Sequence, residues 1–279
     1  MSGVLRSASA LARSCHPAPS AGVTAFATVL AVTAGNGAGT CALLALAVLA
    51  GQLSIGWSND RLDAARDRAV ARTDKPIATG ELAHRTVEVA IAVALAACVA
   101  CSLALGWRAG LLHLAAVSGG WLYNLWLKAT WFSWLPYAAA FGALPAIAVL
   151  AVPGHPAPAA WPIAAGACLG VAAHLTNVLP DLAGDRATGI RGLPHRIGAR
   201  ASLALTGPLL VAATGCAAFG PPGVPFLLGW LAFAVSVVVA VLGPAVLWRR
   251  PAGKLAFYAI FVVVALELAV IVADGHRLR

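Results

Sequence analysis

Long apolar segments follow one another through almost the whole chain, and each is long enough to cross a lipid bilayer as a helix. Hydrophobic residues make up 61% of the 279 residues, whereas charged residues make up only 10%. A helical span requires about 20 mostly apolar residues. Within hydrocarbon, a helix satisfies its backbone hydrogen bonds internally. The chain therefore has the composition of an all-α integral membrane protein.

Nine segments of this kind lie between charged stretches and proline or glycine breaks. They cover residues 21–35, 40–57, 86–105, 109–126, 133–152, 160–179, 201–219, 225–247 and 255–273. We therefore predict a polytopic membrane protein with about nine transmembrane helices. We expect residues 1–279 to form a single transmembrane domain that begins with an inner N-terminal segment, residues 1–18.

The net charge of +9 is compatible with a nucleic-acid binder, but the positions of the basic residues favour a membrane topology. If the N-terminus lies inside, every lysine and arginine except Arg108, Arg277 and Arg279 falls on the inner side. Such a bias toward the cytoplasmic side is typical of multispanning proteins. We predict a cytoplasmic N-terminus, contact with membrane lipid and no nucleic-acid partner; in a bacterium the membrane would be the plasma membrane.

Two acidic motifs stand at the inner ends of apolar segments. The first, N-D-x-x-D-x-x-x-D, consists of Asn59, Asp60, Asp63 and Asp67, and the second, N-x-x-x-D-x-x-x-D-x-x-x-G, consists of Asn177, Asp181, Asp185 and Gly189. These motifs hold five of the ten carboxylates in the chain. A carboxylate at the border of hydrocarbon is costly unless a cation offsets it. The motifs therefore mark a site at which cations are expected.

The spacing within each motif places its polar side chains on one face of a helix. If the second apolar segment continues as a helix past Trp57, the four residues of the first motif fall within an arc of about 100°. In the second motif, His174, Asp181 and Asp185 fall within about 40°. Pro180 lacks a backbone donor and is expected to kink this helix just before Asp181.

The chemistry of the motifs favours magnesium. Hard oxygen ligands without cysteine or clustered histidine suit Mg²⁺ better than zinc. Mg²⁺ is typically held by one or two carboxylates and completes its shell with water and substrate phosphates. Two acidic helices that face one another would hold metal ions between them, with a diphosphate bridging the ions. The alternative is a pair of solvated helix ends whose aspartates balance nearby arginines; two motifs on the same inner face favour the metal–diphosphate site.

Basic residues follow the motifs at positions from which they could bind a diphosphate. They are Arg72 and Lys75 after the first motif, Lys128 with Tyr123 at the inner end of the fourth span, and Arg186, Arg191 and Arg196 after the second motif. Fixed cations beside a leaving diphosphate stabilise the charge that develops there. For each basic residue alone, a topological role or a contact with anionic lipid is the alternative.

The two motifs also open the long inner connections, residues 58–85 and 180–200, which we predict to be catalytic loops. Each connection follows an even-numbered span, and the two lie about 120 residues apart. This arrangement indicates a weak internal repeat, with two halves that face one another. The aromatic residues between Trp121 and Tyr137 are typical of an interfacial belt, with carbocation stabilisation as the alternative. For Glu267 in the ninth span, a hydrogen bond between helices is favoured over catalysis.

On these residues the chain resembles the UbiA superfamily of intramembrane prenyltransferases. The similarity extends over nine spans, both acidic motifs, the basic residue before Pro76, Gly80, the Tyr123/Lys128 pair, and Leu193, Pro194 and Gly198. Many members of that superfamily have Y-x-x-x-K, and this chain has one more intervening residue.

The resemblance implies that the motif residues bind two Mg²⁺ ions and a polyprenyl diphosphate. It also implies a central cavity that opens sideways to lipid. There an allylic cation would attack an acceptor, commonly an aromatic ring such as a hydroxybenzoate or a naphthoate. Two other functions remain open: a terpene cyclase that uses the same site without an acceptor, and a divalent-cation transporter. Transport sites normally lie at the bilayer midplane, which disfavours the transporter.

Overall fold

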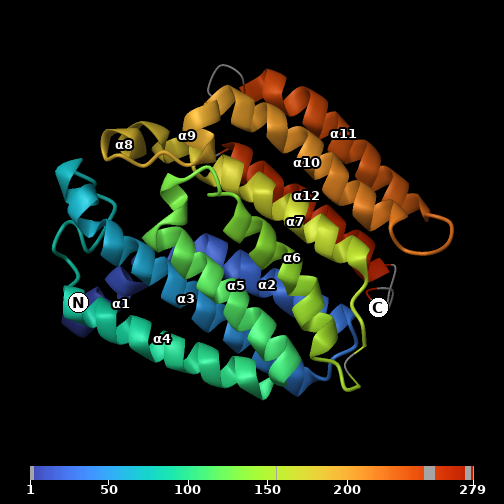
Figure 1. Cartoon of the computed structure of the whole chain (residues 1–279), viewed down its shortest axis with the longest axis horizontal. Coiled ribbons are helices and arrows are strands. Elements are labelled where there is room, and N and C mark those ends of the chain that lie inside the picture. Colours follow the sequence, from blue (N-terminus) through green and yellow to red (C-terminus); the bar gives the residue numbers. More distant parts are fainter. Residues whose placement is uncertain (1–2, 155, 248–254, 274–277, 279) are drawn as a thin grey trace.

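The computed structural model describes residues 3–154, 156–247, 255–273 and 278, and these residues form helices joined by turns and loops (Figure 1). The first half contains α1 (Gly3–Ser14), α2 (Pro17–Thr33), α3 (Ala38–Ala69), α4 (His84–Ala104), α5 (Trp107–Leu125), the 3₁₀ helix η1 (Leu127–Ala129) and α6 (Leu135–Leu150). The second half contains α7 (Ala160–Asn177), the 3₁₀ helix η2 (Leu179–Asp181), α8 (Leu182–Ala187), α9 (Leu193–Ile197), α10 (Ala199–Phe219), α11 (Leu227–Leu247) and α12 (Leu255–Ala273).

The prediction of an all-α fold is confirmed, and a long helix lies in each of the nine predicted segments. Among the described residues, four stretches are long and apolar enough to cross a membrane: α3, α4, the stretch from α7 through α8, and α10. The pair α1 and α2 would add a fifth if it forms one span, although the two helices are bent by 68°. α6 and parts of α11 and α12 are shorter apolar helices.

The core lies where helices from both halves of the chain meet. Leu30 of α2, Leu44 of α3, Ile147 of α6 and Leu169 of α7 belong to one buried cluster, and α6–α7 and α3–α4 are extensively packed neighbours. On outward faces, large apolar side chains such as Val93 of α4 stay exposed. That distribution suits a helical bundle surrounded by lipid, where apolar side chains face hydrocarbon as well as one another.

α7 approaches α6 closely because two glycines face it. A Cβ atom added to Gly166 would lie 2.5 Å from the carbonyl oxygen of Phe141, and one added to Gly170 would lie 2.2 Å from that of Tyr137. Small residues spaced by four let membrane helices pack backbone to backbone. As a result the rings of Tyr137 and His174 meet at a centroid distance of 4.9 Å.

Two local predictions about the acidic segments are confirmed. α3 continues past Trp57 to Ala69, so the first motif is helical throughout. The second motif is interrupted at Pro180, where the chain passes through the 3₁₀ turn η2 before α8 begins. The break follows from the missing N–H of proline, which cannot continue the α-helical ladder.

Glu267 forms the predicted hydrogen bond between helices. The hydroxyl of Thr214 on α10 donates to Glu267 Oε1 on α12 at 3.0 Å, and Thr214 Oγ1 lies 2.7 Å from the hydroxyl of Ser236 on α11. These contacts satisfy a buried carboxyl group and join three helices at a distance from the acidic motifs.

Candidate functional site

The four spaced aspartates of the two motifs line one cavity of about 250 Å³. Asp63 and Asp67 reach it from the end of α3, while Asp181 and Asp185 reach it from η2 and α8. Arg66 and Arg72 also line the cavity. The spacing of the motifs brings Asp63 and Asp67 to the same space as Asp181 and Asp185, whereas Asp60, which the sequence grouped with them, does not line the cavity.

Asp63 is the most heavily partnered carboxylate of the first motif. Lys128 Nζ donates to Asp63 Oδ1 at 2.6 Å, and Arg66 forms an ion pair with the same oxygen. Asn59 Nδ2 donates to Asp63 Oδ2 at 3.3 Å. Asn59 is itself held from the neighbouring helix, because it donates to Asn124 Oδ1 at 3.3 Å. Asn124 thus fixes the start of the motif from α5.

One ion pair joins the two acidic segments directly. Arg72 Nη1 donates to Asp181 Oδ1 at 2.9 Å. The same guanidinium donates two hydrogen bonds, of 2.8 and 2.9 Å, to the carboxylate of Asp74. That pairing lowers the pKa of Asp74 to about 2 and raises the pKa of Arg72 above its ordinary value. Arg72 is therefore a permanent cation at the wall of the cavity.

Lys128 is a buried cation. It lies on η1 with 8% of its surface exposed. Burial, with the charge of Arg66 as a second cause, lowers the pKa of Lys128 to about 7. Its partner Asp63 is shared with Arg66, so this carboxylate does not fully offset the loss of water around the ammonium.

Asp185 has a histidine partner, because His195 Nε2 lies 3.2 Å from Asp185 Oδ2. Ser133 holds the loop between α8 and α9 against η1. Its hydroxyl accepts from the backbone N–H of Leu193 at 2.8 Å and lies 2.9 Å from His174 Nε2. Gly192 makes this approach possible, since a Cβ there would lie 2.5 Å from the carbonyl oxygen of Lys128.

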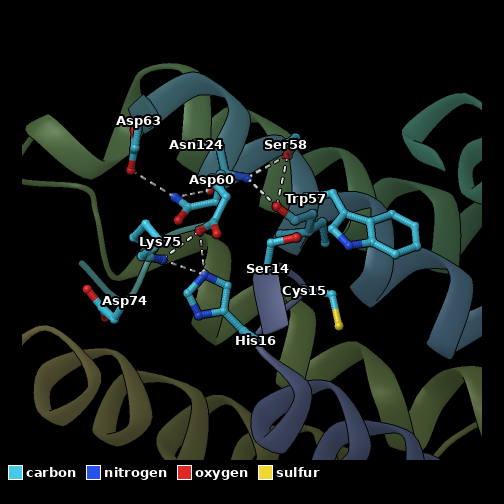
Figure 2. A network of polar contacts seen from close by, with 12 residues as sticks. Ser14, Cys15, His16, Trp57, Ser58, Asp60, Asp63, Asp74, Lys75 and Asn124 are labelled. Atoms are coloured by element: carbon cyan, nitrogen blue, oxygen red, sulfur yellow. Dashed lines mark hydrogen bonds and ion pairs between the residues drawn. The ribbon is translucent and has the colours of Figure 1, made fainter. Parts of the chain in front are cut away.

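Several predicted site residues lie away from the lining of this cavity. Asp60 is buried and contacts Lys75 and His16 (Figure 2). Arg196 lies over the ring of Trp131, 4.9 Å from its centroid. Their predicted roles toward metal or diphosphate stay predictions.

Tyr123 and Asn177 are tied to one aromatic group. The rings of Tyr123 and Tyr137 meet edge to face at a centroid distance of 5.3 Å, and Tyr123 also contacts His174 at 5.8 Å. Asn177 Nδ2 donates to the hydroxyl of Tyr137 at 3.3 Å. Trp126, in contrast, is largely exposed, as expected of an interfacial belt.

A second cavity of about 290 Å³ adjoins the first, and Arg66 and Ile190 line both. Its other lining residues include Lys128, Asn124, Leu125 and Trp126. The second cavity therefore combines a polar edge at Lys128 and Arg66 with apolar side chains from the end of α5.

The donor set of the first cavity fits Mg²⁺, although Asp63 and Asp181 are paired with basic side chains. Among the described residues, no three or more His, Cys, Asp or Glu side chains lie close enough together to hold a metal ion. Mg²⁺ needs only one or two carboxylates when water and phosphate supply the other oxygens. Asp63 with Asp67, and Asp181 with Asp185, provide such pairs on the two sides of one cavity.

The sequence reasoning missed four residues that shape the site: His16, Arg66, Asn124 and His195. Asn124 and His195 carried a usable signal, because each is polar and lies within a few residues of a predicted site residue. His16 is far from both motifs in the sequence, so spacing gave no indication of its position.

The model of the UbiA prenyltransferase family matches residues 20–269 of the chain. None of the curated proteins compared with the chain matches it significantly.

Solved structures with the same fold include an apo UbiA homolog from Aeropyrum pernix K1, with a TM-score of 0.72 and 19% identity, covering 91% of this chain and 97% of that one. A UbiA homolog from Archaeoglobus fulgidus bound to GPP and Mg²⁺ has a TM-score of 0.72 and 17% identity, and the match covers 95% of this chain and 98% of that one. A digeranylgeranylglyceryl phosphate synthase structure has a TM-score of 0.70 and 14% identity and covers 100% of both chains.

Proposed function

The chain belongs to the UbiA prenyltransferase family, and we propose that it transfers a prenyl group from a polyprenyl diphosphate to a lipophilic or aromatic acceptor within the membrane, with Mg²⁺ as cofactor. One observation carries the proposal: four aspartates from two distant segments line the same cavity together with Arg66 and Arg72. A diphosphate is the substrate group that this mixture of carboxylates and cations suits, because metal ions bridge the like charges.

We assign Mg²⁺ binding to Asp63, Asp67, Asp181 and Asp185, with Asn59 and Asn177 at the start of each motif as further oxygen donors. Bound Mg²⁺ would neutralise charge on the diphosphate and make it a better leaving group. A similar structure, that of a UbiA homolog from Archaeoglobus fulgidus, is bound to GPP and Mg²⁺, which supports the choice of ligands.

The chain's own cations stabilise the departing diphosphate. Arg72 and Lys128 each donate to an aspartate in the cavity, at 2.9 and 2.6 Å. When the diphosphate arrives, these N–H groups can exchange a carboxylate oxygen for a phosphate oxygen without moving far. Donors that are already in place when charge develops lower the barrier to breaking the C–O bond.

The second cavity is our candidate for the acceptor. It shares Arg66 with the first cavity and is lined by Leu125 and Trp126, so a ring placed there would lie beside the proposed diphosphate site. We further propose that both acidic segments face the cytoplasm, since basic residues accumulate on their side of the chain.

The test is transfer of a labelled prenyl group by membranes that contain the protein, with diphosphates of several chain lengths, an acceptor panel, and Mg²⁺ or a chelator. We expect Mg²⁺-dependent product, and a loss of activity of about 100-fold or more in Asp63→Ala and Asp181→Ala. Glu88→Gln is the matched control, because Glu88 is an exposed carboxylate that pairs with Arg61 outside the cavity.

Near-normal transfer by Asp63→Ala or Asp181→Ala would contradict the proposal. Release of pyrophosphate with a hydrocarbon product and no use of any acceptor would replace it with the cyclase.

A further inference from the structure

Asp60 stands apart from the other aspartates of the first motif, because it does not line the cavity. Its side chain is 2% exposed. Lys75 Nζ donates to Asp60 Oδ1 at 2.6 Å, and His16 Nε2 lies 3.2 Å from the same oxygen (Figure 2). A buried carboxylate is tolerated when a cation and hydrogen bonds compensate it. Lys75 is that cation, so Asp60 and Lys75 act as a pair.

His16 contacts both members of this pair. Besides its contact with Asp60, its Nε2 atom lies 3.4 Å from Lys75 Nζ. A carboxylate oxygen only accepts, so in the tautomer with its proton on Nε2 His16 donates to Asp60 Oδ1, and the same oxygen accepts an N–H of the Lys75 ammonium. A carboxylate held in place by His16 in turn fixes the direction of the flexible lysine side chain that donates to it.

The fold places His16 at this point by an unusual backbone corner between α1 and α2. His16 has φ 54° and ψ 65°, a left-handed conformation that non-glycine residues adopt rarely and at a cost. Gly56 lies one helical turn before Asp60 on α3, and a Cβ there would lie 2.5 Å from the carbonyl oxygen of Cys15. Trp57 Nε1 also donates to the carbonyl oxygen of Leu11 at 2.9 Å. The corner is therefore seated directly on the face of α3 that carries Asp60.

Lys75 belongs to the segment that supplies the diphosphate-binding cations. Residues 70–83 connect α3 to α4, and Arg72 of this segment reaches across to Asp181. Among the described residues, one side-chain ion pair joins this segment to α1: that of Glu81 with Arg13, which is exposed. The described side-chain contacts of Lys75 are those to Asp60 and His16.

We propose that His16 is a positioning residue for Lys75: together with Asp60 it holds the ammonium, and with it the 70–83 segment, at the edge of the diphosphate site. This inference rests on the proposed prenyltransferase function and adds to it. Asp60 then serves the site through Lys75 and not as a metal ligand.

The first measurement is steady-state kinetics of His16→Ala. We expect its KM for the prenyl diphosphate to rise about tenfold, the effect of losing one hydrogen bond to a charged group. We expect kcat at saturating diphosphate and the KM for the acceptor to stay within about twofold. His16→Gln keeps an N–H donor for Asp60 in its side-chain amide and should recover most of the lost affinity.

A double-mutant cycle separates positioning from general folding. If His16 acts through Lys75, His16→Ala/Lys75→Ala should have the same KM as Lys75→Ala alone. Arg13→Ala is the matched control, because it breaks the ion pair that joins residues 70–83 to α1 without touching Asp60 or Lys75. We expect its kinetics to equal those of the wild type.

A wild-type KM in His16→Ala, additive effects in the cycle, or an equal rise in Arg13→Ala would each overturn the inference. If His16→Ala does not fold, the cycle is run with His16→Asn, whose shorter amide does not reach Asp60. Wild-type protein without Mg²⁺-dependent transfer would defeat the proposed function instead. The affinity of wild type and His16→Ala for inorganic pyrophosphate with Mg²⁺ would then decide the positioning role on its own, with equal affinities counting against it.

Discussion

The charge state of Lys128 should govern how the enzyme responds to pH. Burial lowers the pKa of Lys128 to about 7, so the ammonium is lost as the pH rises through that value. The neutral amine cannot attract a diphosphate, and kcat/KM for the diphosphate, which reports groups of the free enzyme, should therefore fall on the alkaline side of about pH 7. Lys128→Arg keeps its charge over the whole accessible range.

The measurement is kcat/KM between about pH 6 and about pH 9 with Mg²⁺ in excess. We expect an alkaline limb in the wild type and its disappearance in Lys128→Arg, even if the arginine variant is slower. A limb at the same pH in both proteins would assign it to another group.

At the level of single residues, the sequence motif predicted the four cavity aspartates but grouped Asp60 with them. Helical periodicity gives the direction of a side chain around the axis, and Asp60 and Asp67 differ by only about 20°. They are nevertheless about 10 Å apart along the helix. At the turn of α3 that carries Asp60, the backbone corner at His16 packs against the helix. No local pattern reveals that the N-terminal residues fold back onto this turn.

At the level of elements, the two acidic helices end in the same way. At the end of α3, Arg72 N donates to Asp67 O at 2.9 Å and Ala71 N to Arg68 O at 3.1 Å. At the end of α8, Ile190 N donates to Asp185 O at 2.9 Å and Gly189 N to Arg186 O at 3.2 Å. Both are Schellman caps. In each, the last aspartate of the motif stands at the same place relative to the cap, which agrees with the internal repeat indicated by the sequence.

The two caps differ in the residue at the left-handed position, and this difference predicts opposite effects of substitution. Ala71 has φ 53° and Gly189 has φ 87°. Gly189→Ala should destabilise the protein by about 1 kcal/mol, and Ala71→Gly should stabilise it by up to about the same amount, because only glycine adopts this conformation without cost. Thermal unfolding of the purified variants in detergent measures both.

A Cβ on Gly189 would meet nothing within 4 Å, so the change in stability caused by Gly189→Ala reports the backbone conformation alone. A Gly189→Ala protein as stable as the wild type would show that the cap contributes nothing to folding.

The long helices could be predicted from sequence because each lies in an uninterrupted apolar segment. α8 is the expected continuation of the second acidic helix past the kink at Pro180, whereas α9 was not predicted, since five residues give no periodicity. The close packing of α7 on α6 was readable in principle from Gly166 and Gly170, which are spaced by four. In an apolar helix, however, hydrophobicity does not show which face meets a neighbour, and the tyrosine–histidine contact could not be derived.

At the level of the whole molecule, the functional cavity lies between the two halves of the chain. α8 and α9 lie at the same end of the bundle as the end of α3 (Figure 1). An ion pair between Arg72, which follows α3, and Asp181, which precedes α8, links the two halves. The four cavity carboxylates repel one another, and Arg66, Arg72 and Lys128 offset that repulsion. A ligand that replaces these internal ion pairs has to satisfy both the carboxylates and the cations.

This requirement predicts that Mg²⁺ and inorganic pyrophosphate stabilise the protein only together. Mg²⁺ alone would bind the aspartates by displacing Lys128, Arg66 and Arg72 without giving these cations a new partner. Pyrophosphate alone would meet the aspartates as like charges. Together they give every charged group an opposite one, and at about 100 times Kd the gain is about 2.7 kcal/mol.

For a chain of this size that gain corresponds to a rise in Tm of roughly 5 to 10 °C, measured by thermal unfolding in detergent. Asp67→Asn should lose most of the rise, because it removes a carboxylate from the cavity wall, whereas Glu88→Gln should keep it. An equal rise with Mg²⁺ alone would mean that the metal site forms independently of the diphosphate. The arrangement argues against that result: each of Asp63 and Asp181 already has a basic partner, and the anionic substrate is what releases those partners to bind it.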